Sequence, residues 1–261
     1  MKQVSVPGNP KQRPENLPPQ TAATPPFPSG RIDVWTVHLD EPATAAGSGP
    51  SVLSPDEIAR ASRFHFEKDR SQFTRCRSAL RVLLSRYLAI PATEIRFEYL
   101  ASGKPQLAAA QNPRALQFNV SHSAGIALIA ICANRRLGVD IEKIRDDVDT
   151  TSLAERFFSL RERAGLQALP AHLRLPGFFA CWTRKEAFLK ATGEGLSFPL
   201  ADFSVTTHPA LDPVLEEIRG NTEAAQQWSL ADLSVVDGYR AGVAVEGAFP
   251  HLETCTHNCT F

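Results

Sequence analysis

The sequence lacks the features that mark membrane-bound, exported or nucleic-acid-binding proteins. Its 28 Lys and Arg residues balance 28 Asp and Glu residues, so bulk charge gives no attraction to nucleic acid or to an anionic membrane. The longest apolar run, from Gly125 to Ala133, is too short to cross a bilayer. The N-terminus has no apolar centre of a secretion signal. We therefore expect a cytoplasmic protein with no nucleic-acid partner and no membrane partner.

Several well-known catalytic motifs are also missing. The sequence contains no P-loop pattern and no dinucleotide-binding glycine fingerprint after a strand. It also contains no G-x-S-x-G nucleophile elbow. The absence of the elbow disfavours the hydrolase that Ser121 and His122 by themselves would suggest.

Cysteine is sparse and scattered. Three of the five cysteines lie inside apolar patterns typical of small core residues, namely Cys76, Cys132 and Cys181. The other two, Cys255 and Cys259, flank His257 near the C-terminus. Either a metal clip or a frayed tail would fit that arrangement, and both interpretations stay open.

The distribution of proline and of apolar periodicity predicts where the folded part begins. Residues 1–30 hold eight of the 20 prolines and little periodicity, so we predict a disordered Pro-rich leader. We predict strands at 31–39, 94–100, 117–121, 126–133, 136–142, 202–206, 227–235 and 239–246. We predict helices beginning at Ser54 and spanning 68–89, 150–157, 159–169 and 175–192.

This order of elements predicts an α+β chain of two similar α/β subdomains. The first subdomain would span residues 31–145 and the second 146–248, leaving a tail at 249–261. Between Arg60 and Arg86 there are eight basic residues against two acidic ones. That part of the chain is either a solvated helix surface or an anion-binding face.

The segment Gly138-Val139-Asp140-Ile141-Glu142 carries the first chemical signal. Alternation on a strand sends both carboxylates to one face of the sheet, away from the two apolar side chains. A divalent cation would relieve the repulsion between them, and hard oxygen ligands favour Mg²⁺ or Mn²⁺. Gly138 is expected to leave room for a ligand. The alternative is a solvated strand edge.

The second signal is the helical run Trp182-Thr183-Arg184-Lys185-Glu186-Ala187-Phe188-Leu189-Lys190. Glu186 and Lys190 lie one turn apart, a spacing that also fits a surface salt bridge. A third segment, Asn119-Val120-Ser121-His122-Ser123, ends a strand with hydroxyls around His122. That histidine is either a phosphate ligand or a structural residue.

Taken in order, these segments resemble the 4′-phosphopantetheinyl transferases of the large, pseudo-dimeric type. The family pattern is Gly-x-Asp-x-Glu, followed some forty residues later by Trp-[Ser/Thr/Cys]-x-Lys-Glu-[Ala/Ser]-x-x-Lys, and residues 138–142 and 182–190 match it. Further matches are 103–105, 118–123, 156–159 and 195–200. The resemblance covers about residues 31–248.

The resemblance implies two α/β subdomains related by a pseudo-twofold, with coenzyme A in the cleft between them. It implies transfer of the phosphopantetheine arm of coenzyme A to a serine of an apo acyl or peptidyl carrier protein. Adenosine 3′,5′-bisphosphate would be released. The carrier would belong to a polyketide, nonribosomal peptide or fatty-acid synthase. The large type is usually monomeric, so we expect a monomer.

The resemblance also assigns roles to individual residues. Mg²⁺ would be held by Asp140, Glu142 and Glu186. Glu186 or a metal-bound water would take the serine proton, while Lys190 would stabilise phosphoryl charge or protonate the leaving group. The residues expected to contact coenzyme A are Arg60 at its 3′-phosphate, Lys104 near the nucleotide, and Ser121 and His122 at phosphate oxygens.

One position departs from the family pattern. Some relatives carry two basic residues at the 3′-phosphate, and the expected partner of Arg60 falls on or near Glu57. Arg63 or Lys68 would be the substitute. Two other functions fit the same residues: a non-catalytic module that binds coenzyme A or a carrier protein, and a Mg²⁺-dependent phosphohydrolase.

Overall fold

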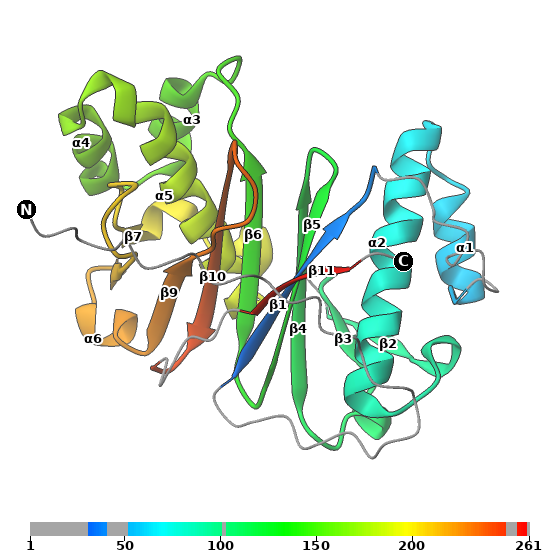
Figure 1. The fold of residues 1–261 in the computed structure, drawn as a ribbon. Helices are drawn as coiled ribbons and strands as arrows, with labels where there is room; N and C mark the ends of the chain where they lie inside the picture. Colours follow the sequence, from blue (N-terminus) through cyan, green and yellow to red (C-terminus); the bar gives the residue numbers. More distant parts are fainter. Residues whose placement is uncertain (1–30, 41–51, 101–102, 249–254, 260–261) are drawn as a thin grey trace, which may run out of the picture.

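The computed structural model describes residues 31–40, 52–100 and 103–248, together with the backbone of 255–259. The predicted leader, residues 1–30, lies outside the described residues. Figure 1 shows strands in the middle of the molecule, with helices to either side. Among the described residues, no helix is long and apolar enough to cross a membrane.

The N-terminal sheet has the strand order β11-β1-β5-β4. Its strands are β1 (Ile32–His38), β4 (Leu116–Ser123), β5 (Ile126–Ala133) and β11 (Cys255–Cys259). The long helix α2 (Glu67–Leu88) covers one face, where Leu80 and Leu83 pack with Trp35 of β1. The short helix α1 (Pro55–Ala61) precedes α2, and β2 (Phe97–Tyr99) pairs with β3 (Pro105–Leu107) beside it.

The C-terminal sheet has the order β6-β10-β9. Its strands are β6 (Leu137–Lys143), β9 (Trp228–Asp232) and β10 (Tyr239–Glu246), and α5 (Ala171–Thr192) covers one face. Around it lie α3 (Thr150–Phe157), α4 (Leu160–Ala168), the pair β7 (Phe203–Val205) and β8 (Leu215–Ile218), and α6 (Thr222–Ala225). Both covering helices, α2 and α5, are 22 residues long.

The two sheets share a third apolar core. Strand β1 sends Trp35 and Val37 toward α2 and the alternate residue Val34 toward the second sheet. There Val34 joins Val139 of β6 and Val243 of β10 in one fully buried cluster. The layers are therefore α2, sheet, sheet, α5 (Figure 1), which confirms the α+β class and the two similar subdomains related by a pseudo-twofold.

A seam of side-chain hydrogen bonds joins β4 to β6. The amides of Val139, Ile141 and Lys143 donate to three β4 side chains at 2.8, 3.4 and 3.2 Å. The three acceptors, which we call the seam residues, are Asn119 Oδ1, Ser121 Oγ and Ser123 Oγ. Each lies 20 positions before its donor. Because the offset is constant, β6 lies parallel to β4, and its edge amides are satisfied without a backbone ladder.

The observed pairing changes three expectations. The predicted boundary near residue 145 assigns β6 to the N-terminal subdomain, whereas its ladder runs to β10 of the C-terminal sheet. Cys255–Cys259 form β11, parallel to β1, so this part of the tail is not frayed. Helix α5 begins at Ala171 rather than 175, with Pro176 in its second turn. Long-range pairing decides the first two differences, and a local pattern does not encode it.

Candidate active site

The acidic strand β6 faces helix α5. A Cβ at Gly138 would lie 2.1 Å from the carbonyl oxygen of Ala187 and 2.4 Å from the amide nitrogen of Ala191. Gly138 is thus needed for the close approach of β6 to α5. The expectation that it leaves room for a ligand is wrong, because the helix backbone fills that space. The same approach brings Asp140, on the same face of β6, to the inner side of α5.

Lys190 and Ser121 meet on one oxygen of Asp140. Lys190 Nζ donates to Asp140 Oδ1 at 2.6 Å, and Ser121 Oγ donates to the same oxygen at 2.8 Å. Lys190 Nζ is also 2.9 Å from Ser121 Oγ. Burial raises the pKa of the Asp140 carboxyl, while the ammonium of Lys190 opposes the rise. Three predicted site residues from β4, β6 and α5 are therefore in contact.

The other two predicted carboxylates share this electrostatic environment. Glu142 Oε2 accepts a 2.8 Å hydrogen bond from Ser123 Oγ. Burial raises the pKa of Glu142, and the hydrogen bond from Ser123 lowers it in part. Burial also raises the pKa of Glu186, with further increases from the charges of Asp140 and Glu142. Each carboxylate therefore sits in the field of another, as expected of a cation site.

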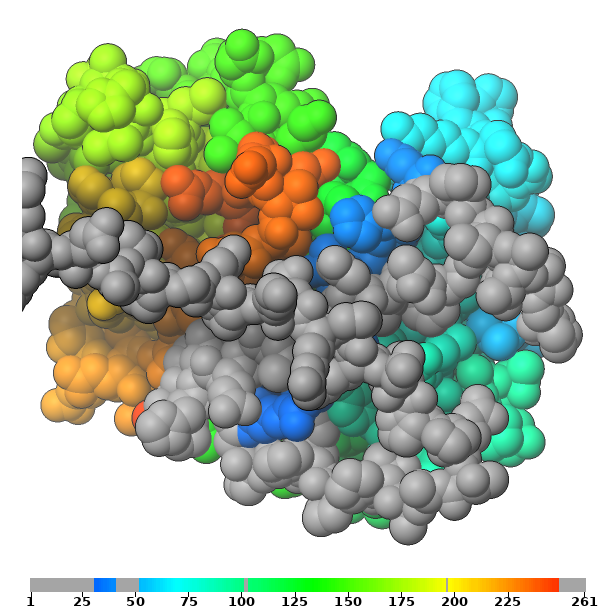
Figure 2. All heavy atoms as spheres, in the orientation of Figure 1, coloured from blue at the N-terminus to red at the C-terminus, as the bar shows by residue number. Residues whose placement is uncertain are grey.

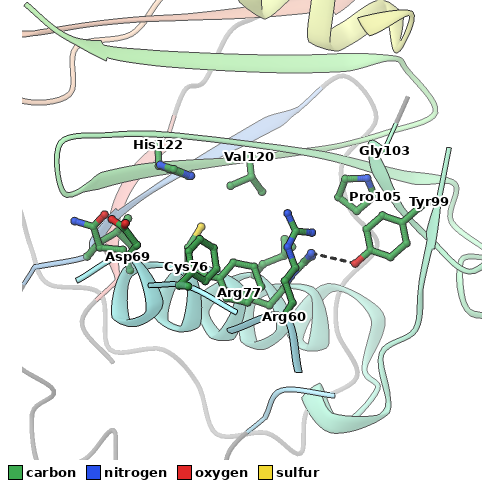
Figure 3. Close-up of a pocket in the computed structure, with 14 residues that line it drawn as sticks. Arg60, Asp69, Cys76, Arg77, Tyr99, Gly103, Pro105, Val120 and His122 are labelled. Atoms are coloured by element: carbon green, nitrogen blue, oxygen red, sulfur yellow. Dashed lines mark hydrogen bonds between the residues drawn. The ribbon is translucent and has the colours of Figure 1, made fainter. Parts of the chain in front are cut away.

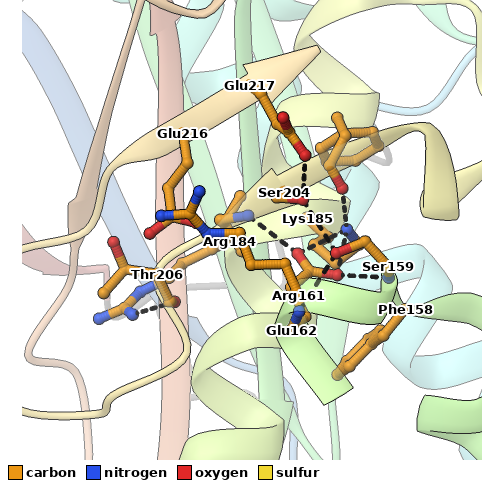
Figure 4. Close-up of polar contacts among 12 residues, drawn as sticks. Phe158, Ser159, Arg161, Glu162, Arg184, Lys185, Ser204, Thr206, Glu216 and Glu217 are labelled. Carbon is orange, nitrogen blue, oxygen red and sulfur yellow. Dashed lines mark hydrogen bonds and ion pairs between the residues drawn. The ribbon is translucent and has the colours of Figure 1, made fainter. Parts of the chain in front are cut away.

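Two buried cations fix the rotation of α5 about its axis. Lys185 Nζ donates to both oxygens of Glu162, at 2.7 and 2.8 Å, and to Phe203 O at 2.6 Å (Figure 4). Arg184 donates to both carboxylate oxygens of Asp232 and to three loop carbonyls. Because both residues are held in the C-terminal subdomain, Glu186 is left to turn toward β6.

The three site carboxylates offer hard oxygen ligands for a divalent cation. Among the described residues, no group of three or more His, Cys, Asp or Glu side chains is close enough to hold a metal ion as it stands. Lys190 pairs with Asp140 Oδ1, but Asp140 Oδ2 is buried without a hydrogen bond. A buried, unpartnered carboxylate oxygen is costly and is the ligand type that Mg²⁺ prefers. The donor set therefore fits a hard cation.

A pocket of about 390 Å³ opens on the other side of β4. It lies between α1, α2, the β2–β3 pair and β4, and both Arg60 and His122 line it (Figure 3). Burial lowers the pKa of His122, and the nearby Lys190 ammonium lowers it further. In Figure 2 the upper edge of the molecule dips between the cyan N-terminal helices and the green segment after β6.

Strand alternation divides the β4 motif between these two regions. Val120 and His122 line the pocket, whereas Ser121 and Ser123 contact the carboxylates of β6. The sequence grouped Ser121 with His122 as phosphate ligands. In the structure Ser121 Oγ is engaged by Asp140 and Lys190.

Lys104 takes a position that the sequence did not indicate. Its neighbours Gly103 and Pro105 line the pocket, while Lys104 Nζ donates to Leu137 O at 3.2 Å and to Lys190 O at 2.5 Å. Lys104 thus ties the β2–β3 pair to the start of β6 and the end of α5. A contact with the nucleotide stays a prediction.

Sequence reasoning missed Arg77 among the pocket residues. It belongs to α2, is buried, and lines the pocket beside Arg60. Glu57, the position expected to be basic, is itself buried and pairs with Arg77 and Arg81. The available signal was the one-turn spacing of Arg77 and Arg81 on α2, following a helix α1 whose first turn carries the carboxylates Asp56 and Glu57.

A carboxylate-and-lysine cluster beside an arginine-lined pocket defines an enzyme that handles a phosphorylated substrate. Residues 136–244 match the family model described as the 4′-phosphopantetheinyl transferase superfamily. Residues 44–134 match the model described as 4′-phosphopantetheinyl transferase, N-terminal. The chain belongs to the 4′-phosphopantetheinyl transferase superfamily and is of its large type.

Individual relatives agree with this assignment. The chain is 38% identical over 219 residues to the 4′-phosphopantetheinyl transferase HetI of Nostoc sp., covering 84% of this chain and 89% of HetI. It is 30% identical over 179 residues to the 4′-phosphopantetheinyl transferase Sfp of Bacillus subtilis, covering 68% and 77%. The N-terminal family model ends at residue 134 and the other begins at residue 136, between the end of β5 and the start of β6.

Proposed function

We propose that this enzyme moves the 4′-phosphopantetheine arm of coenzyme A to a serine hydroxyl of an apo acyl or peptidyl carrier protein. The observation that carries the proposal is the contact of Lys190, Asp140 and Ser121 beside the pocket lined by Arg60 and His122. The names of the relatives, all of them phosphopantetheinyl transferases, support it.

The reaction exchanges one phosphorus–oxygen bond for another. The serine oxygen of the carrier forms a bond to the phosphorus that bears pantetheine. The bond from that phosphorus to the bridging oxygen breaks, and adenosine 3′,5′-bisphosphate leaves with the electron pair. Glu186 takes the serine proton, aided by burial, which raises the pKa of its carboxyl; such a base contributes about 10²–10⁴-fold.

The remaining site residues bind charge that develops on phosphate oxygens. Lys190 stabilises the leaving phosphate, and His122 donates to the pyrophosphate from the pocket wall. Arg60 binds the 3′-phosphate, and Lys104 holds the turn beside the nucleotide. Mg²⁺ or Mn²⁺, held by Asp140, Glu142 and Glu186, supplies neutralising charge when bound.

We place the enzyme in the cytoplasm as a monomer, without nucleic-acid or membrane partners. The zero net charge of the chain and its resemblance to the large family type support this assignment.

A direct test weighs the product. Purified enzyme is mixed with coenzyme A, Mg²⁺ and an apo carrier domain, and the carrier mass is measured. A gain of one phosphopantetheine unit is expected. No gain on several carriers, together with tight coenzyme A binding, would favour the binding module. Cleavage of the pyrophosphate without a carrier would favour the phosphohydrolase.

Two variants make the assay specific. Glu186→Gln keeps the shape of the side chain but removes the base, so transfer should be lost while the circular dichroism spectrum is retained. Glu194→Gln is the matched control, because Glu194 is an exposed carboxylate just beyond the end of α5. Full activity of Glu186→Gln would remove Glu186 from the mechanism.

A further inference from the structure

The pocket beneath β4 is lined by two guanidiniums, Arg60 and Arg77, and by one carboxylate, Asp69. Arg77 and Arg81 follow each other by one turn on α2, and both approach Glu57 of α1. Arg81 Nε lies 2.6 Å from Glu57 Oε2, and Arg77 Nε lies 3.2 Å from Glu57 Oε1. Arg60 adds a third guanidinium at the end of α1. Two guanidiniums therefore share one buried carboxylate, and a third lines the same pocket.

Arg81 is fully committed to the fold. It is 1% exposed, and besides Glu57 it donates to the carbonyls of Ala92 and Ile95 at 2.8 and 2.9 Å. Its role is to anchor α1 and the segment after α2, so it does not serve a ligand in the pocket. The carboxylate charge of Glu57 is used mainly by Arg81, because that contact is shorter.

Arg77 is held in place and shares the charge of Glu57 with Arg81. Its Nη2 donates to Tyr99 Oη at 3.3 Å, and its guanidinium lies 4.9 Å over the ring of Phe97. Glu57 Oε1, the nearest carboxylate oxygen, is buried and makes no hydrogen bond. Figure 3 shows the side chains of Arg77 and Arg60 rising from the helices into the same space below Val120.

The guanidinium of Arg60 also rests on an aromatic ring. Its guanidinium lies 5.4 Å over the ring of Phe73, another residue that lines the pocket. Two guanidiniums resting on aromatic rings, with few of their donors used, form a preorganised receptor for an oxyanion. Arginine suits a phosphate monoester because its planar fork matches two phosphate oxygens at once.

We propose that Arg77 is the second 3′-phosphate ligand of this enzyme, acting beside Arg60, and that Glu57 is its positioning residue. The inference rests on the proposed function, which places the pyrophosphate at Lys190 and His122 and leaves the terminal phosphate of coenzyme A for the arginine pair. At Glu57, where a basic residue was expected, this chain carries a buried counter-ion. Arg77 of α2 supplies the positive charge that is missing there.

The test compares coenzyme A with dephospho-coenzyme A, which lacks only the 3′-phosphate. Binding of each is measured by calorimetry with the full chain and no carrier protein. We expect the wild type to prefer coenzyme A. Loss of a charged hydrogen bond in Arg77→Met should weaken coenzyme A binding by about 10- to 100-fold, with little change for dephospho-coenzyme A. Equal losses for both ligands would overturn the proposal.

Four further variants separate the charge of Arg77, its positioning by Glu57 and its place in the pocket. Arg77→Lys should recover part of the preference, since it keeps the charge without the fork. Glu57→Gln should reduce the preference through Arg77 and leave the binding of dephospho-coenzyme A unchanged, whereas a disturbed α1 would weaken the binding of both ligands. Arg75→Met, on the same helix but outside the pocket lining, is the matched control. If Arg63→Met abolished the preference and Arg77→Met did not, the second ligand would be Arg63 and the proposal would fall.

The outcomes also separate this inference from the proposed function. If the wild type loads a carrier but binds both ligands equally, the proposed function stands and the inference about Arg77 is wrong. If the preference of the wild type for coenzyme A depends on Arg77 but no carrier is loaded, the inference stands and the proposed function is wrong. A wild type that binds neither ligand overturns both. Thermal unfolding of each variant checks that a lost preference does not reflect a lost fold.

Discussion

The buried carboxylates of α4 and of β6 differ in how completely they are satisfied. Each oxygen of Glu162 on α4 accepts two hydrogen bonds, from Lys185 and from the amide of Ser159 or Val205. Asp140 on β6 has two donors on Oδ1 and no partner on Oδ2. Fully satisfied polar groups fix a fold, whereas an unsatisfied oxygen invites a ligand.

A buried carboxylate oxygen without a hydrogen bond occurs at each end of the proposed coenzyme A cleft. In the described part of the chain, the only two buried side-chain oxygens without a hydrogen bond belong to Asp140 and Glu57. One faces the proposed metal and phosphate site, and the other lies beside the arginine pair. Glu162 therefore serves stability, whereas Asp140 serves the proposed chemistry, and substitutions should separate these two carboxylates.

The largest expected effect is on catalysis, at Asp140. Asp140→Asn keeps the shape but removes the charge that balances Lys190 and a cation. Transfer should fall by at least about 100-fold, the upper end of what even outer-shell substitutions cost at metal sites. Carrier mass at fixed times measures the rate. Retention of more than half of the wild-type rate would contradict the assignment of Asp140 to the proposed chemistry.

The next effect is on stability, at Glu162. Glu162→Gln leaves the buried Lys185 ammonium without its counter-ion, and breaking such a pair costs about 3–5 kcal/mol. Urea unfolding measures the loss, and activity per folded molecule should fall far less than in Asp140→Asn. Glu216→Gln is the control, because its pair with Arg161 is open to solvent, with side chains 25% and 65% exposed, and surface pairs contribute about 0–1 kcal/mol. A comparable loss in both variants would contradict the assignment.

The sequence predicted which residues share a face better than it predicted which elements they meet. Alternation placed Asp140 and Glu142 on one face, and helical spacing placed Glu186 near Lys190. Neither pattern indicates which sheet β6 joins or that Gly138 abuts α5, because both follow from long-range packing. Arg77 was hidden within a basic helix whose buried face was not evident from charge alone. The strand β8 and helix α6 also escaped prediction, since four residues carry little periodicity.

A smaller effect is expected at the seam between β4 and β6. Asn119→Ala removes the acceptor for the buried amide of Val139, and an unsatisfied buried donor costs about 1–3 kcal/mol. Chemical denaturation measures the change. Gln117→Ala, two residues earlier on β4 and not one of the seam residues, is the control. An equal loss at both positions would show that the seam does not act through its hydrogen bonds.

The smallest effect concerns the pH dependence of stability at Lys104. Burial lowers the pKa of Lys104 from 10.5 to about 8 in the folded protein. Between these values the unfolded chain binds more protons, so this lysine makes the free energy of unfolding rise with pH. The rise from pH 7.5 to 9.0 should be about 1 kcal/mol and should be absent from Lys104→Met. Urea titrations of both proteins at the two pH values measure the difference. An identical pH dependence would mean that Lys104 stays solvated and does not tie the β2–β3 pair to β6 and α5.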